Sequence, residues 1–166
     1  MRRLFSFPNP VNEAAARAVA CGVVILTVLA LSLQSPIVLY ILCAGFWARM
    51  LTGPTLSPLG QFAVRVVAPR LTSTPRLVPG PPKRFAQGIG AALTSVAVVL
   101  SLTVGWAPAA GMLALVLVAA SLEGFLGYCL GCTVFGWLMR IGVVPERVCA
   151  DCSALSSRYE RAAARA

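Results

Sequence analysis

Two pairs of cysteines carry the clearest chemical signal in the sequence. Cys129 and Cys132 enclose Leu-Gly, Cys149 and Cys152 enclose Ala-Asp, and sixteen residues separate the two pairs. Because cysteines three positions apart face the same way, each pair could hold one side of a tetrahedral metal ion such as Zn²⁺. The ligands would then be Cys129, Cys132, Cys149 and Cys152. The same spacing suits thiols that cycle between dithiol and disulfide, so both chemistries stay open.

The rest of the composition excludes several kinds of site. The chain of 166 residues contains no histidine and has a formal net charge of +9. Without histidine, Ser-His and Cys-His catalysis and every histidine-containing metal site are excluded. Cys21 and Cys43 stand alone in apolar stretches, where most cysteines are small core residues. The composition leaves open whether the chain is an enzyme.

The polarity of the chain indicates a membrane protein. Hydrophobic residues make up 58% and charged residues 11% of the sequence, whereas about a quarter of a typical soluble domain is charged. A transmembrane helix needs about 20 apolar residues. We predict an all-α membrane protein whose four transmembrane helices form two hairpins, with spans over residues 14–33, 36–51, 85–105 and 107–126.

The last apolar stretch is too long for one span. It runs to about Met139 and is interrupted only by Glu123, so a straight helix would exceed the roughly 30 Å of hydrocarbon in a bilayer. Gly124, Gly127 and Gly131 mark the expected bend. Gly127 and Gly131 also form a GxxxG pattern, which favours close helix packing. We therefore predict a bent or interfacial helical segment within a cysteine segment over 127–153.

The distribution of basic residues predicts the orientation. The short loops at 34–35 and 105–106 contain no lysine or arginine, whereas the segment from Arg49 to Arg84 contains six. Since basic residues mark the cytoplasmic side, both termini are expected to be cytoplasmic in a multi-pass protein. Lipid is then the principal partner. It also accounts for the positive charge, so no nucleic acid is expected.

The inner loop, residues 52–84, contains a further helical pattern. Ser57 and Pro58 resemble a helix start. The apolar residues that follow have helical spacing: Leu59, Phe62, Ala63, Val66 and Val67. They predict an amphipathic helix on the inner leaflet or, alternatively, a helix packed on the bundle. The proline-rich residues 72–84 are expected to form an extended linker.

Three charged residues fall within the predicted spans. Arg17, Arg49 and Glu123 lie at similar depths by helix rise, and an unpaired ion in the bilayer is costly. We therefore predict that Glu123 pairs with Arg49, Arg17 or both. Such a pair would fix helix register, or it would belong to a polar cavity that opens beside the cysteines.

Four segments of the sequence resemble a bacterial membrane family catalogued as domain of unknown function 4395. The segments are Phe7–Glu13, Lys83–Gly90, Glu123–Cys132 and Gly142–Cys152, and the last is similar to the ending of actinobacterial members. The resemblance covers about residues 5–153 and implies a single integral membrane domain over 1–153. A basic Ala/Arg tail over 154–166, which we expect to be mobile, lies outside it.

The resemblance implies a fold but no reaction. Family members are small four-helix proteins of the bacterial cytoplasmic membrane, often encoded near rhodanese-type sulfurtransferases and thioredoxin-like proteins. The first hypothesis is therefore a thiol redox or sulfur-transfer protein with such a cytoplasmic partner. Cys129 and Cys132 would be its reactive thiols, and Glu123 would be a proton acceptor or counter-ion.

Two alternatives are a non-enzymatic membrane subunit with a structural four-cysteine zinc site, and a carrier or channel for a small sulfur compound. Since four helices are few for a transporter, the carrier would require oligomers. The sequence leaves the cofactor unknown: zinc is the main candidate of the metal interpretation, and an iron–sulfur cluster is a minor one.

Overall fold

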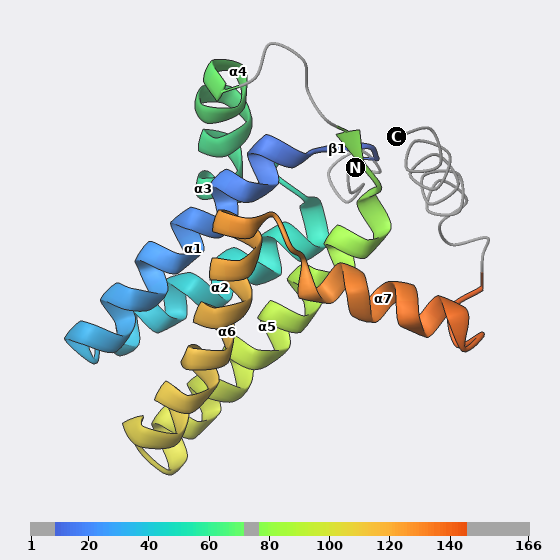
Figure 1. Ribbon diagram of the computed structural model, residues 1–166. Coiled ribbons are helices and arrows are strands. Elements are labelled where there is room, and N and C mark those ends of the chain that lie inside the picture. Colours follow the sequence, from blue (N-terminus) through green and yellow to red (C-terminus); the bar gives the residue numbers. More distant parts are fainter. Residues whose placement is uncertain (1–8, 72–76, 146–166) are drawn as a thin grey trace.

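Four long helices occupy the four apolar stretches of the sequence (Figure 1). The computed structural model describes residues 9–71 and 77–145. The long helices are α1 (Glu13–Leu33), α2 (Pro36–Thr52), α5 (Gly80–Thr103) and α6 (Trp106–Leu126). Among the described residues, α1, α5 and α6 are long and apolar enough to cross a membrane, and α2 is a shorter apolar helix.

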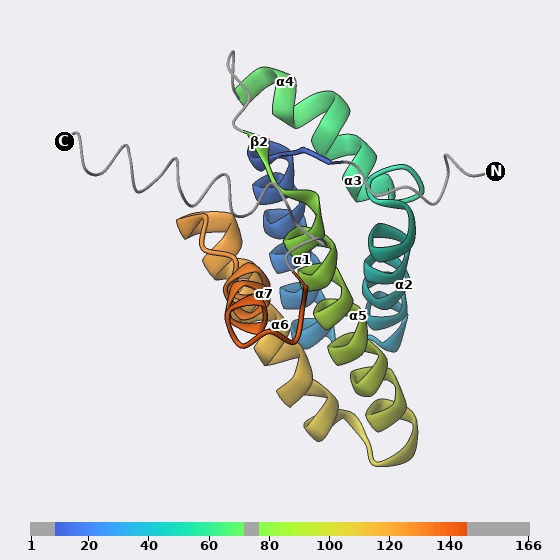
Figure 2. The same cartoon turned by 90° about the vertical axis from the view of Figure 1, so that its right-hand side faces the viewer.

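The four helices form two hairpins with short turns. Gln34 adopts the left-handed conformation (φ 47°) after α1, and Gly105 has a φ of 119° between α5 and α6. Contacts between α2 and α5 and between α1 and α6 join the two hairpins, while α5 and α6 contact each other within the second hairpin, as Figures 1 and 2 show. Consequently the starts of α1 and α5 and the ends of α2 and α6 all lie at one end of the bundle.

The helices bury small and branched residues against one another and leave large apolar side chains outside. Leu39, Leu42 and Leu113 are fully buried. Gly90 allows α5 to approach α2 closely, because a Cβ atom there would lie 2.2 Å from Cε1 of Phe46. The large apolar side chains left exposed include Ile25, Leu33, Ile37, Leu102, Val118 and Leu126. Such an apolar exterior is compatible with lipid as the solvent.

The inner loop contains a helical segment that packs against α1. It consists of α3 (Pro58–Phe62), a π-helical turn η1 (Ala63–Val67) and α4 (Ala68–Leu71). The Ser57 hydroxyl caps α3 by accepting a hydrogen bond of 3.2 Å from the Gly60 N–H. The segment also approaches α1 closely, since a Cβ atom at Gly22 would lie 2.5 Å from Cδ1 of Leu59. This part of the inner loop is therefore helical in three short pieces, with one face on the bundle.

Helix α5 begins at Gly80, five residues earlier than the sequence predicted, so the expectation of an extended linker up to residue 84 was wrong. Pro81 and Pro82 occupy the first turn, where a helix N–H has no partner within the helix and proline is tolerated. The Gly80 N–H instead donates to Oδ1 of Asn9, at 2.9 Å. Strands β1 (Val11–Asn12) and β2 (Leu77–Val78) pair antiparallel beside this contact.

The last apolar stretch is interrupted at Gly127. Helix α6 ends there because Gly127 adopts the left-handed conformation (φ 69°), and α7 (Leu130–Arg140) begins three residues later. Helix α7 crosses the start of α5 (Figure 1), where a Cβ atom at Gly131 would lie 2.5 Å from Cβ of Ala86. The two glycines of the GxxxG pattern thus have different roles: Gly127 makes the turn, and Gly131 makes the close contact.

The contact at Gly131 predicts an asymmetry between two glycines of α7. Gly131→Ala should lower the free energy of unfolding by about 1–3 kcal/mol, because the added methyl group meets the α5 backbone. Gly136→Ala is the matched control, since a Cβ atom at Gly136 meets nothing within 4 Å, and alanine favours the helix by up to about 1 kcal/mol. Thermal unfolding of the purified chain in detergent measures both. Equal effects would contradict this account of the α5–α7 contact.

Candidate functional site

Cys129 and Cys132 form a close dithiol at the start of α7. Cys129 is the N-cap of this helix, and its sulfur accepts a hydrogen bond of 3.3 Å from the Cys132 N–H. The Cys132 thiol donates to the same sulfur, with the two Sγ atoms 2.6 Å apart. Both cysteines are free thiols. The short extended link after Gly127 thus places a sulfur atom at a helix N-terminus, where negative charge is stabilised.

The two thiols differ in acidity. The hydrogen bond from Cys132, together with the positive charge of Lys83 and the Cys132 N–H, lowers the pKa of Cys129 below that of an ordinary thiol. The pKa of Cys132 is raised, because its proton is held in that hydrogen bond and because the thiol is largely buried. Cys129 is therefore the more acidic thiol of the pair, and Cys132 donates the hydrogen bond between them.

A buried ion pair between Lys83 and Glu123 lies next to the dithiol. Lys83 comes from the first turn of α5, and Glu123 from the last turn of α6. Glu123 therefore pairs with Lys83 instead of the predicted partners, Arg17 and Arg49. The physical reason is the early start of α5, which turns Lys83 into the bundle rather than leaving it in a solvated linker. The doublet Pro81-Pro82, typical of a helical first turn, was the signal in the sequence that could have revealed it.

Arg17 and Arg49 have separate partners. Arg17 donates to the last carbonyl groups of α6, at 3.3 Å to Gly124 and 2.9 Å to Phe125. It therefore stabilises the end of the helix where the chain turns toward Cys129. Arg49 is buried on α2 and donates to Oε1 of Gln87 at 2.9 Å.

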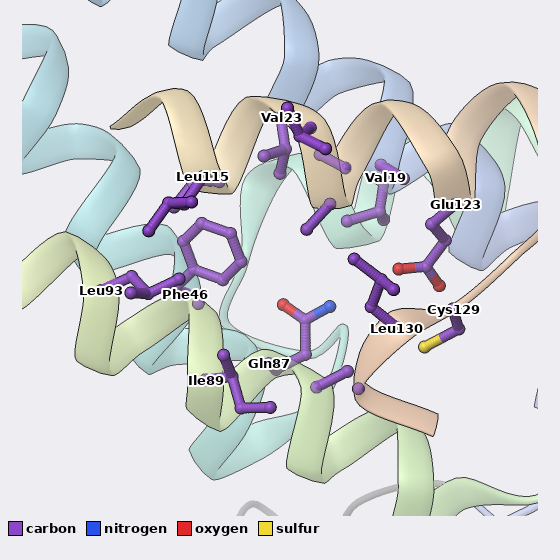
Figure 3. Close-up of a pocket in the computed structure, with 18 of the residues that line it drawn as sticks. Val19, Val23, Phe46, Gln87, Ile89, Leu93, Leu115, Glu123, Cys129 and Leu130 are labelled. Atoms are coloured by element: carbon purple, nitrogen blue, oxygen red, sulfur yellow. The ribbon is translucent and has the colours of Figure 1, made fainter. Parts of the chain in front are cut away.

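Cys129 and Glu123 border a cavity of about 350 Å³ between the helices. Figure 3 shows Cys129, Glu123 and Gln87 at the edge of this space, with Phe46, Val23 and Leu115 among the apolar side chains around the rest. The cavity therefore has an apolar body and a polar side at which the Cys129 sulfur is placed. Such a shape suits a small molecule that presents one reactive or polar group.

Cys21 and Cys43 lie apart from this dithiol. Cys21 packs against α6, where a Cβ atom at Gly124 would lie 3.0 Å from its sulfur. The Cys43 sulfur lies 3.6 Å from the Ser95 hydroxyl, between α2 and α5. Cys149 and Cys152 lie outside the described residues.

The four-cysteine zinc site stays a prediction. No group of three or more metal-ligating side chains occurs within residues 9–71 and 77–145. Cys129 and Cys132 lie close enough together to supply two ligands of the predicted zinc site, and the other two predicted ligands, Cys149 and Cys152, lie outside the described residues.

Comparison with known proteins identifies the family. The chain belongs to the family described as domain of unknown function (DUF4395), whose model matches residues 11–140. No curated protein matches the chain, and no solved structure matches it. The matched range contains both the dithiol and the Lys83–Glu123 pair.

The charges beside Cys129 predict opposite effects on its reactivity. Lys83→Gln should raise the pKa of Cys129 and slow its alkylation near neutral pH by roughly tenfold, whereas Glu123→Gln should lower the pKa and speed the reaction. The pH dependence of alkylation at Cys129, followed by mass spectrometry of the purified chain, measures both.

Arg84→Gln is the control for these charges. Arg84 is exposed next to Lys83 and donates to the Met50 carbonyl, so its loss should leave the reaction unchanged. Shifts of the same sign for Lys83→Gln and Glu123→Gln would rule out the electrostatic cause.

Proposed function

For this member of the DUF4395 family, we propose a membrane thiol protein that carries out thiol redox or sulfur-transfer chemistry. One observation carries the proposal: Cys129 lies against Cys132 at a helix N-terminus, borders an apolar cavity, and has a pKa lowered chiefly by its hydrogen bond from Cys132. A thiolate at a helix N-terminus is the nucleophile of thiol–disulfide exchange. Lys83 supplies a positive charge that favours this thiolate, and Glu123 opposes it.

The protein is proposed to span the bacterial cytoplasmic membrane four times, with both termini in the cytoplasm. The 17 residues of α2 rise about 26 Å, close to the roughly 30 Å of bilayer hydrocarbon. The exposed Arg65 and Arg70 of the inner-loop helical segment lie at the same end of the bundle as the start of α5. Under the positive-inside rule, this end and its dithiol face the cytoplasm.

The first half-reaction would take place at the cavity. The Cys129 thiolate attacks one sulfur of a small disulfide, which forms a mixed disulfide and releases one thiolate. If the substrate is a persulfide attacked at its outer sulfur, Cys129 becomes a persulfide, one thiolate is released, and hydrosulfide leaves in place of the second thiolate. Cys132 then loses its proton and attacks the Cys129 sulfur, which closes the Cys129–Cys132 disulfide and releases the second thiolate. Glu123 lines the cavity as a nearby carboxylate for that proton. Two electrons pass from the dithiol to the substrate.

The second half-reaction would regenerate the dithiol through a cytoplasmic thioredoxin-like partner, which supplies two thiols and therefore two electrons. Cys129 is only 8% exposed, whereas Cys132 is more accessible. A partner thiolate would therefore attack the Cys132 sulfur, and Cys129 would leave as the stabilised thiolate. A thiol of lower pKa is the better leaving group. A second partner thiol then completes the exchange and leaves the partner oxidised.

Mild oxidation provides a test of the dithiol. A small disulfide such as oxidised glutathione should convert Cys129 and Cys132 of the full chain into an intramolecular disulfide, detected by peptide mass spectrometry. In Cys132→Ser, Cys129 should retain the mixed disulfide because no second thiol resolves it. Cys21→Ser and Cys43→Ser should behave like the parent chain. Failure of Cys129 to react in the folded protein would remove the basis of the proposal.

The orientation can be tested by labelling single cysteines. In a chain whose native cysteines are all replaced by serine, Gln34→Cys and Arg70→Cys each place a thiol at an exposed position. An impermeant maleimide added to intact cells should label position 34, and should label position 70 only after permeabilisation. The reverse pattern would place the dithiol outside the cytoplasm and exclude the proposed partners.

A further inference from the structure

A second cavity of about 290 Å³ lies beside the first, near the starts of α1 and α5. Val19, Gln87 and Glu123 line both cavities and therefore form the wall between them. The second cavity differs in character, because Arg49 and Lys83 also line it. It has two positive side chains and one negative side chain in its lining.

Arg49 is held rigidly and has unused hydrogen-bonding capacity. It is only 5% exposed. Its Nε donates to Gln87 at 2.9 Å and its Nη1 to the Ser57 hydroxyl at 3.3 Å, while the guanidinium lies 4.7 Å from the centre of the Phe46 ring. Within the described part of the chain, Nη2 is buried and has no hydrogen-bond partner.

Such an atom is unusual because a buried polar group normally has a partner. Leaving a charged donor without one costs free energy, both through lost hydrogen bonding and through desolvation. Lys83 offsets Glu123, so the charge of Arg49 is the one left uncompensated in the cavity lining. A ligand with negative charge and acceptor oxygens would remove both costs.

We propose that this cavity binds a small oxyanion of the carboxylate, sulfate or phosphate class. Nη2 of Arg49 would donate to one oxygen, and the ammonium protons of Lys83 that Glu123 does not use would donate to another. The planar guanidinium suits oxyanions particularly well. The site is separate from the dithiol, and the proposal does not depend on thiol chemistry.

Equilibrium binding of isotope-labelled inorganic phosphate and sulfate to the purified full chain, in detergent and at constant ionic strength, tests the site. Saturable binding of one anion per chain, displaced by an unlabelled oxyanion and much less by chloride, is the expected result. Arg49→Met should weaken binding by about 10- to 100-fold, the loss typical of hydrogen bonds to charged groups.

Matched variants separate the site from general charge effects. Arg84→Met removes an exposed arginine near the start of the same helix as Lys83 and should bind like the parent chain. Cys129→Ser should also bind normally, which distinguishes this site from the dithiol. Arg49→Lys keeps the charge but loses the planar donor set, so it should bind about tenfold more weakly. This variant serves if Arg49→Met does not fold.

Nanodiscs identify the source of the oxyanion. If discs of phosphatidylglycerol abolish phosphate binding that discs of phosphatidylcholine allow, the natural occupant is the phosphate of an anionic lipid. If binding is equal in both, the occupant is a free anion. The absence of saturable oxyanion binding in detergent and in phosphatidylcholine would overturn the proposal, as would equal binding by the folded Arg49→Lys or Arg49→Met variant and the parent chain.

Discussion

The ion pair between Lys83 and Glu123 joins the parts of the protein that carry polar chemistry. It links the first turn of α5 to the last turn of α6, directly before the chain turns into Cys129. Each member would be costly alone in an apolar bundle, so the two charges hold these helix ends in one register. Glu123 borders both cavities and Lys83 borders the second, and the two charges shift the pKa of Cys129 in opposite directions.

The break between α6 and α7 turns an apolar stretch into a reactive site. If α6 and α7 formed one continuous helix, the Cys129 side chain would lie on the side of that helix. The backbone N–H groups around it would be bonded within the helix, so none would be free to donate to its sulfur. The turn at Gly127 starts a new helix, and its N-terminal N–H and Cys132 thiol both point at Cys129. Arg17 stabilises the carbonyl end of α6 on the other side of the break. The backbone turn at Gly127 and the charge of Arg17 thus both act on the short link that leads into Cys129.

Much of the architecture follows from the sequence alone. Four apolar stretches separated by uncharged or basic segments predict the long helices, because the hydrophobic effect and lipid both require such stretches to be helical. The cap at Ser57 and the break near Gly127 are also local, since they depend on residue type and backbone preference. The pairing of Cys129 with Cys132 is set by their spacing of three. Each of these features is determined by residues only a few positions away in the sequence.

Tertiary structure decided the partners of the buried charges. Helical depth placed Arg17, Arg49 and Glu123 at one level, yet Glu123 pairs with Lys83, because which side of a helix faces its neighbour depends on packing between helices distant in sequence. The same packing leaves Nη2 of Arg49 without a partner in the described chain and creates two adjacent cavities. Residue type determined which side chains could react. Which of these side chains meet was determined by the contacts among α1, α2, α5 and α6, because such contacts join residues that are distant in the sequence.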